Sequence, residues 1–451
     1  MESTTPNRFL LLLFFFFLHT NLTLPAPLFP KEALPTKSGY LPVNPNSESS
    51  IFYLFYEAQK PLSTLSKTPL LIWLQGGPGC SSMVGNFFEL GPWRVNFHKR
   101  PDEPLALESN PGSWNRIFGL LFLDNPIGTG FSVASKPEEI PRNQTGVAEH
   151  LFAALKAFIK SDQSFKTRPI YITGESYAGK YVPAIGSYIL KKNAKLPSAD
   201  RINLAGVAIG NAMTDPEIQV TAHAATAFFS GLVNEKQKAE LESLQSLAAA
   251  LTEARNWRAA TNARSRVLQR LKKMTGLATV NDFSKKAPYK DKMVEELLQN
   301  DDVKKALGVK GSVVFEKCSP LVREILREDV MKSAKHMVES LVKESKVLLY
   351  QGSLDLRDGV VSTEAWVKTL SWEGIRSFLN AERKVWKVNG ELAGYVQNWG
   401  SLTNAVVLGA GHLAPADQAL NTQAMIEDWV LDKGLFHKGN YSKSFIRQIV
   451  K

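Results

Sequence analysis

Residues 170–179 read Ile-Tyr-Ile-Thr-Gly-Glu-Ser-Tyr-Ala-Gly, a short apolar run followed at once by a glycine-flanked serine. The apolar run predicts a buried strand, and the G-x-S-x-G pattern after it predicts a tight turn into a helix. Side chains larger than those of Gly174 and Gly179 would clash in such a turn, which strains the serine backbone and aims its hydroxyl out of the sheet. Ser176 is therefore the candidate nucleophile.

Other short apolar runs along the chain also end in glycine-rich or polar turns. Continuous apolar runs followed by turn signals predict strands that are buried on both faces. Such runs occupy residues 70–74, 120–123, 204–209, 347–350 and 405–408. Helical patterns at residues 146–160 and 415–431 alternate with them, which predicts an α/β fold with a mostly parallel central sheet. Ligands of such sheets bind beyond the carboxyl ends of the strands, where these turns fall.

We interpret residues 213–325 as a helical cap inserted into the sheet domain. Residues 235–274 contain neither proline nor glycine and are rich in Ala, Leu, Glu, Lys and Arg, a composition that favours helices. Between residues 235 and 310, 16 Lys and Arg stand against 10 Asp and Glu. We interpret this basic surface as a solvated helix face, with a site for an anionic partner as the alternative. Residues 24–212 and 326–451 then form the two halves of the core.

The N-terminus carries the pattern of a signal peptide. Arg8 precedes ten uninterrupted apolar residues, 9–18, and prolines follow at positions 25 and 27. Ten apolar residues cannot span a bilayer as a helix but suit a cleaved leader. Residues 1–23 are therefore predicted to direct the chain to the cell exterior or the vacuole. No later stretch approaches 18 consecutive apolar residues, which predicts no stable membrane anchor.

Secretion changes the interpretation of Cys80 and Cys318, the two cysteines of the chain. In an oxidising compartment two thiols are expected to pair, with two buried free thiols as the alternative. Asn143 and Asn440 begin N-x-S/T sequences and are candidate glycosylation sites. Asn21 fits the same pattern but lies next to the expected cleavage point.

The composition excludes several classes of protein. Hydrophobic residues make up 44% and charged residues 22% of the chain, which is typical of a folded globular protein and not of a disordered or multi-span membrane protein. The net charge of +11 is spread over 451 residues without a basic run or arm, so no nucleic-acid partner is predicted. Two cysteines and seven scattered histidines without H-x-x-x-H spacing predict no metal site, and no cofactor is predicted.

A serine hydroxyl is a weak nucleophile until a base removes its proton, and the base needs an acid to orient it. In hydrolases with this kind of turn, the three residues follow the order serine, acid, histidine along the chain. Asp355 and His412 each follow a predicted strand, and His412 lies in a glycine loop. Both are therefore expected at the same sheet edge as Ser176. We predict them as acid and base, with Asp358 as a rival acid.

The tetrahedral intermediate of acyl transfer needs hydrogen-bond donors for its oxyanion. Residues 76–79, Gly-Gly-Pro-Gly, follow a predicted strand and offer bare backbone N–H groups. The N–H of Tyr177, directly after the serine, is the second expected donor. Phosphate binding by this glycine loop is disfavoured, because the sequence lacks both the Lys-Ser/Thr of a P-loop and the G-x-G-x-x-G order.

Together these motifs resemble the serine carboxypeptidase family, over about residues 35 to 435. The segments that carry the resemblance are residues 73–82 (WLQGGPGCSS), 89–92 (ELGP) and 124–132 (DNPIGTGFS), the serine turn, and the loops around Asp355 and His412. Residues 351–359 and 409–418 are most similar to the plant serine carboxypeptidase-like 50/51 group.

The resemblance implies an α/β-hydrolase fold with a triad of Ser176, Asp355 and His412. It also implies oxyanion donors at Gly77 and Tyr177, and a site for the substrate's terminal carboxylate formed by Gln75, Gly76, Glu89 and Glu175. Two close buried carboxyls cannot both ionise cheaply, so one keeps its proton to higher pH and can donate a hydrogen bond. We therefore expect activity toward peptides to be highest at acidic pH and to fade toward neutrality.

The chain departs from the family pattern in three places. Gln75 stands where the family usually has asparagine, which moves the amide one methylene further out and puts peptide affinity in question. Leu413 replaces the glutamate that is common after the catalytic histidine, and the family's further cap disulfides are absent. Cys80 does match the family cysteine of the glycine loop, and Cys318 matches its partner, which implies a single bridge.

The resemblance implies a serine-type carboxypeptidase that releases C-terminal amino acids from peptides through an acyl-enzyme. One alternative is an acyltransferase on the same fold that uses glucose-ester donors. Those relatives tend to carry aspartate before the nucleophile, so Glu175 favours the peptidase. A second alternative is a binding or protective protein, which the complete triad disfavours. The sequence leaves open the oligomeric state and the side chains preferred at the cleavage site.

Overall fold

The computed structural model of the chain describes residues 28–96 and 103–437. The predicted signal peptide, residues 1–23, and the predicted glycosylation site Asn440 lie outside these ranges. None of the helices in the described part is both long and apolar enough to cross a membrane. Asn143 is described, and its exposed side chain caps a helix by accepting a hydrogen bond from the Gly146 N–H at 3.0 Å.

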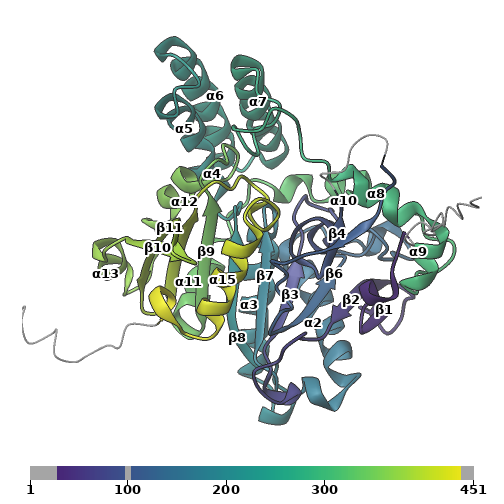
Figure 1. Cartoon of the computed structure of the whole chain (residues 1–451). Helices are drawn as coiled ribbons and strands as arrows, with labels where there is room; N and C mark the ends of the chain where they lie inside the picture. The colour runs from purple at the N-terminus through teal and green to yellow at the C-terminus, as the bar shows by residue number, and fades with distance from the viewer. Residues whose placement is uncertain (1–27, 97–102, 438–451) are drawn as a thin grey trace, which may run out of the picture.

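A ten-stranded sheet forms the centre of the described structure (Figure 1). Its strands run in the order β1-β2-β6-β3-β7-β8-β9-β12-β11-β10. The strands from β6 to β12 in this order are parallel to their neighbours, and antiparallel strands flank them at both edges. The predicted α/β fold with a mostly parallel central sheet is therefore confirmed.

The strands of this sheet are β1 (Lys37–Pro42), β2 (Ser50–Tyr56), β3 (Leu70–Leu74), β6 (Gly119–Leu123), β7 (Ile170–Glu175), β8 (Leu204–Gly210), β9 (Lys346–Gly352), β10 (Lys384–Val388), β11 (Glu391–Trp399) and β12 (Leu402–Val407). A separate pair is formed by β4 (Trp93–Val95) and β5 (Leu107–Ser109).

The apolar runs identified the buried central strands but not the flanking ones. Every residue of β3, β6, β7, β9 and β12 is buried, as a continuous apolar run predicts. The flanking strands β1, β10 and β11 are partly exposed and carry polar side chains among the apolar ones. A search for continuous apolar runs misses such strands, because only part of their surface is buried. The flanking strand β2 was also not predicted, although its residues 51–56 are apolar or aromatic and all but one of them are buried.

Side chains of the parallel strands alternate between two hydrophobic clusters, one on each face of the sheet. Leu70 and Ile72 of β3 belong to one cluster with α2 (Gln144–Lys160), α3 (Ala178–Asn193) and α11 (Lys335–Glu344). Leu71 and Trp73 belong to the other cluster with α8 (Lys292–Gln299) and α15 (Ala419–Val430). Helices therefore cover both faces of the sheet, and the carboxyl ends of the parallel strands remain available for a site.

Helices also fill most of the chain between β8 and β9, the region interpreted from the sequence as an inserted cap. They are α4 (Pro216–Gln219), α5 (His223–Phe229), α6 (Glu235–Glu253), α7 (Trp257–Thr275), α8, α9 (Asp301–Ala306) and α10 (Pro320–Ile325), followed by α11, which packs on α3. The remaining helices are α1 (Ser82–Val84), α12 (Val360–Val367), α13 (Ile375–Asn380) and α14 (Ala414–Asp417).

Helices α6 and α7 pack against each other and, with α5, stand away from the sheet (Figure 1). The composition predicted helix throughout residues 235–274, but the helix breaks at residues 254–256, where Arg255 has a φ of +57°. The break contains neither proline nor glycine, so helix propensity does not reveal it. Asn234 begins α6 with a capping box formed with Gln237.

Candidate active site

Ser176 lies in a tight turn between β7 and α3, as the G-x-S-x-G pattern predicts. Its φ is +62°, in the left-handed region that residues with side chains rarely adopt, so the turn strains the serine backbone. Its N–H donates to the Gly210 carbonyl at 3.0 Å, and its carbonyl accepts from the Met213 N–H at 3.0 Å. A Cβ at Gly179 would lie 2.7 Å from the Ala212 Cβ, so glycine is required for this close packing.

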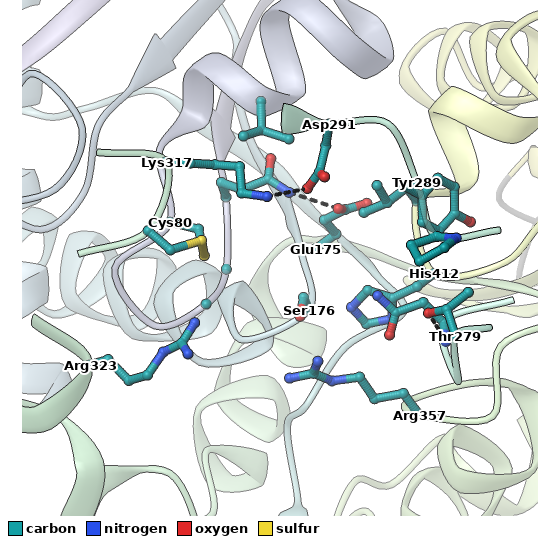
Figure 2. A pocket seen from close by; sticks show the side chains of 18 residues that line it. Cys80, Glu175, Ser176, Thr279, Tyr289, Asp291, Lys317, Arg323, Arg357 and His412 are labelled. Carbon is teal, nitrogen blue, oxygen red and sulfur yellow. Dashed lines mark hydrogen bonds and ion pairs between the residues drawn. A yellow bond between two sulfur atoms is a disulfide. The ribbon is translucent and has the colours of Figure 1, made fainter. Parts of the chain in front are cut away.

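His412 and Asp355 form a buried hydrogen-bonded pair beside Ser176. Asp355 follows β9, His412 follows β12, and His412 Nδ1 lies 2.7 Å from Asp355 Oδ2. Because the carboxylate holds Nδ1, Nε2 is the nitrogen left to act on a substrate or nucleophile. Figure 2 shows the imidazole turned toward Ser176. The structure thus brings Ser176 and His412 to one cavity, with Asp355 behind the imidazole.

Asp358, the rival acid, contacts arginines and not His412. Its Oδ1 lies 3.1 Å from Arg264 Nη2, and its Oδ2 lies 3.4 Å from Arg357 Nε. Burial raises the pKa of Asp358, but the charges of Arg264 and Arg357 outweigh burial and hold that pKa below its ordinary value. Asp355 is therefore the carboxylate that the geometry pairs with His412.

Further donors hold the Asp355 carboxylate, and the sequence analysis identified none of them. Asn211 Nδ2 donates to Oδ2 at 2.8 Å, and the N–H groups of Arg357 and Asp358 donate at 2.7 and 3.3 Å. Asn211 follows β8, and its Oδ1 accepts from the Gly352 N–H at 3.1 Å, so it joins two strand ends. Its position directly after a predicted strand, at the edge where the other site residues lie, is the signal that could have identified it.

The loop that carries His412 is held by a segment of the insertion. The His412 N–H donates to the Asn281 carbonyl at 2.7 Å, and a Cβ at Gly411 would lie 2.5 Å from the same oxygen. Asp417 accepts from the Gly411 N–H at 2.8 Å and from the Tyr289 hydroxyl at 2.6 Å. These contacts fix the imidazole from the side opposite the sheet, so the base depends on both the core and the insertion.

The glycine loop after β3 packs directly on the serine turn. A Cβ at Gly76 would lie 2.5 Å from the Tyr177 nitrogen, so a larger residue would push the loop off the turn. Gly77 has a φ of +117°, a conformation that favours glycine. Within the described residues, the N–H groups of Gly77 and Tyr177 donate to no other protein group. Both can therefore donate to an oxygen bound next to Ser176.

A disulfide bond fastens the glycine loop to the insertion. It joins Cys80 to Cys318, which lie 238 positions apart. On either side of it the two segments exchange backbone hydrogen bonds: the Ser319 N–H donates to the Gly79 carbonyl, and the Ser81 N–H donates to the Lys317 carbonyl, each at 2.8 Å. The bridge therefore fixes the backbone next to the expected oxyanion donors.

Gln75, Glu89 and Glu175 form a buried cluster on one side of Ser176. Gln75 Nε2 donates to Glu175 Oε1 at 2.8 Å and to Glu89 Oε1 at 3.3 Å. The side-chain oxygen of Gln75 accepts from Trp73 Nε1 at 2.8 Å, which fixes the orientation of the amide. The glutamine at this position therefore still reaches both carboxyls, although it departs from the asparagine usual in the family.

Burial changes the protonation of both carboxyls. It raises the pKa of Glu89 to about 8. Burial, together with the nearby charge of Glu89, raises the pKa of Glu175 well above its ordinary value. Oε2 of each side chain has no hydrogen-bond partner within the described residues. Glu175 lines the cavity of Ser176, so its protonated carboxyl can donate a hydrogen bond to an anion there, which a carboxylate could not do. Glu89 does not line this cavity and is connected to Glu175 through the Gln75 amide.

The cavity that joins these parts has a volume of about 290 Å³ and is lined by Gln75, Gly76, Glu175, Ser176 and His412, among others. It brings the residues predicted as nucleophile and base, together with hydrogen-bond donors for an anion, into one space. Across the described ranges, no three His, Cys, Asp or Glu side chains are grouped as a metal site would need.

Comparisons with known proteins agree with this geometry. Residues 27–432 match the serine carboxypeptidase family, peptidase family S10. Serine carboxypeptidase-like 50 of Arabidopsis thaliana is 57% identical over 411 residues, which cover 91% of this chain and 90% of that protein. Serine carboxypeptidase S10 family member 1 of Dictyostelium discoideum is 32% identical over 87% of this chain and 93% of its own length.

A solved structure has the same fold. The crystal structure of Kex1Δp, a prohormone-processing carboxypeptidase from Saccharomyces cerevisiae, matches with a TM-score of 0.78 and 25% identity. The match covers 90% of this chain and 94% of that one. The resemblance seen in the sequence, including the likeness to the plant 50/51 group, is confirmed. The chain belongs to the serine carboxypeptidase family and is a serine-type hydrolase of that family.

Proposed function

We propose that this hydrolase releases C-terminal amino acids from peptides through an acyl-enzyme on Ser176. The observation that carries the proposal is the 2.7 Å contact between His412 Nδ1 and Asp355 Oδ2, beside the cavity that holds the strained Ser176. This arrangement supplies a nucleophile, a base and an orienting acid in the chain order that hydrolases with this turn use.

In the first step, His412 Nε2 accepts the hydroxyl proton of Ser176 as the serine oxygen attacks the carbonyl carbon of the last peptide bond. Asp355 accepts the hydrogen bond from Nδ1 and stabilises the imidazolium that forms. The N–H groups of Gly77 and Tyr177 donate to the oxyanion. His412 then gives its proton to the leaving amine, and a water molecule, activated by the same imidazole, hydrolyses the acyl-enzyme.

The cluster of Gln75, Glu89 and Glu175 supports cleavage at the C-terminus of a peptide. The protonated carboxyl of Glu175, which lines the cavity, can donate a hydrogen bond to a free terminal carboxylate, which an internal peptide bond lacks. We assign the Gly76 N–H, which faces the same cavity, to this anion as well. Recognition in this form requires the cluster to keep its protons, so we place the activity on the acidic side of about pH 8, the pKa of Glu89.

A fluorophosphonate probe and a blocked dipeptide together test the proposal. The probe should label the wild-type protein and not the Ser176→Ala variant, which removes only the hydroxyl. Incubation with an N-blocked dipeptide should liberate the free C-terminal amino acid, detected by mass spectrometry. Circular dichroism checks that the variant folds. A wild-type protein that does not label would indicate a binding or protective role, and labelling without release of the amino acid would contradict the carboxypeptidase assignment.

The acyltransferase alternative is not favoured. Glutamate at position 175 and its hydrogen bond to Gln75 suit recognition of a peptide carboxylate. Glucose esters added to the same assay check this point, because only an acyltransferase would pass their acyl group to an acceptor alcohol.

We also propose that the protein is secreted or vacuolar, as the leader pattern at residues 1–23 indicates. The disulfide between Cys80 and Cys318 suits such an oxidising compartment. Asn143 is exposed, its Oδ1 caps α2, and its Nδ2 has no hydrogen-bond partner among residues 28–96 and 103–437, so glycan attachment there is compatible with the fold. Microscopy of a C-terminally tagged chain and a mobility shift after glycosidase treatment check these two predictions.

A further inference from the structure

A second cavity lies next to Ser176 and is lined by arginines. Its volume is about 350 Å³, and its lining includes Arg264, Arg323, Arg327 and Arg357. Arg323 and Arg357 also line the cavity of Ser176, as does Gly77, whose N–H we assign to the oxyanion. The two cavities therefore meet at the place where a substrate acyl group would be attached.

The carboxylates near these arginines are too few to neutralise them. Arg264 and Arg357 share the single carboxylate of Asp358, at 3.1 and 3.4 Å. Glu324, which also lines this cavity, contacts Arg327 at 2.9 Å and Arg258 at 2.8 Å, so its charge is shared between two arginines. Arg323 forms no ion pair with any residue in the described ranges. Positive charge in a cavity attracts an anionic group when nearby carboxylates do not neutralise it fully.

The two ends of the site have opposite chemistry. Figure 2 shows the guanidinium groups of Arg323 and Arg357 on the side of Ser176 opposite Glu175. In the proposed function, the terminal carboxylate of the substrate lies against Glu175, so the leaving residue occupies that side. The residue before the scissile bond then extends past Ser176 toward the arginines.

We propose that the arginine cavity receives the side chain of the penultimate residue and selects an acidic one, glutamate or aspartate. The inference rests on the proposed function and specifies its substrate class. Arg323 and Arg357 provide planar guanidinium donors that suit a carboxylate, and Arg264 adds positive charge behind them. On the opposite side, Lys317 is neutralised by Asp291 at 2.9 Å, so no comparable charge selects the leaving residue there.

Hydrolysis of N-blocked dipeptides that differ only in the penultimate residue tests this inference. The series carries glutamate, glutamine, leucine or lysine before a constant C-terminal leucine, at pH 6, where a substrate glutamate is ionised. Glutamate and glutamine have nearly the same shape, so the ratio of their kcat/KM values isolates the charge. We expect a ratio of about tenfold in favour of glutamate in the wild type, as for a charge-assisted contact made in the transition state.

Substitution of the arginines should remove this preference. Arg323→Gln and Arg357→Gln should each lower the ratio, and Arg323→Glu should raise the relative rate of the lysine peptide, a reversal that general destabilisation would not produce. Arg270→Gln is the matched control, because Arg270 lies on α7, pairs with Glu240 and lines neither cavity. Its ratio should equal that of the wild type. Because Arg323 is exposed, we expect its variants to fold, so they test the inference even if Arg357→Gln does not fold.

The possible results distinguish failure of the arginine subsite from failure of the proposed carboxypeptidase reaction. Cleavage of the glutamine peptide at the same rate as the glutamate peptide, or a preference that survives loss of both arginines, would overturn the arginine subsite alone. A wild-type enzyme that labels with fluorophosphonate but cleaves none of the four peptides would overturn the proposed carboxypeptidase and the subsite with it.

Discussion

The carboxyl cluster predicts a specific pH dependence for peptide hydrolysis. Burial raises the pKa of Glu89 to about 8, and the pKa of Glu175 lies well above its ordinary value, so the pair loses its first proton near pH 8. Once that proton is lost, the cluster carries a negative charge next to the terminal carboxylate of the substrate, and repulsion weakens binding. We therefore expect kcat/KM for peptides to fall as pH rises through about 8. This midpoint lies at a higher pH than the sequence analysis predicts, since it expects activity to fade already toward neutral pH.

The size of the fall follows from a single ionisation. With a pKa of about 8 for Glu89, roughly nine-tenths of the enzyme has the protonated pair at pH 7, and roughly one-tenth at pH 9. The value of kcat/KM should therefore drop about tenfold between these two pH values. A variant with both Glu89→Gln and Glu175→Gln carries no ionisable group in the cluster, so its profile should be flat over the same range.

A substrate without a terminal carboxylate provides the control. A small activated ester uses Ser176 and His412 but has no anion for the cluster, so its hydrolysis by the wild type should not fall between pH 7 and 9. The two profiles are measured in the same buffers at constant ionic strength. If the ester and the peptide lose activity in parallel, the fall belongs to another group. If the peptide profile stays flat or rises up to pH 9, the protonated pair does not recognise the substrate.

Three further predictions concern the support of the site. Asn211→Ala removes the 2.8 Å donor to Asp355 and should lower kcat about 10- to 100-fold with little change in KM, measured by steady-state kinetics; an unchanged kcat would contradict the role of Asn211. Replacing Cys80 and Cys318 by alanine should lower the free energy of unfolding by about 2–5 kcal/mol in urea titrations, whereas an unaltered midpoint would show that the bridge is not stabilising. The third follows from Glu89, which keeps its proton in the folded state at pH values where the unfolded chain has lost it. Glu89 should therefore make the free energy of unfolding fall as pH rises from about 4.5 to about 8, by up to ~1.4 kcal/mol per pH unit, and Glu89→Gln should remove this contribution and leave that of Glu175.

The parts of the site that the sequence predicts are those encoded by local patterns. The serine turn needs only a strand, two glycines and a helix in succession, so residues 170–179 reveal it completely. Asp355 and His412 were placed by their order after predicted strands, because parallel strands end at one edge of the sheet. The local pattern could not decide between Asp355 and Asp358, since both follow the same strand.

The parts that the sequence did not predict depend on contacts between distant segments. Asn211 donates to Asp355 across 144 positions of sequence. Its place after a predicted strand indicates the right edge of the sheet but does not identify Asp355 as its partner. Gln75 bonds Glu175 across 100 positions, and the burial that raises the pKa of both carboxyls arises only when the sheet is assembled. The break between α6 and α7 is missed for a different reason, because Ala254 and Arg255 have good helix propensity and only Asn256, the N-cap of α7, favours a helix boundary.

The chain between β8 and β9 therefore contributes directly to the site. Asn281 holds the His412 backbone, and Cys318 holds the glycine loop that offers the oxyanion donors. The proposed arginine cavity takes Arg264 and Arg323 from the same insertion. If the arginine subsite is as proposed, a change that shifts the backbone of this segment should alter both substrate preference and turnover, whereas a side-chain substitution such as Arg323→Gln should alter preference alone.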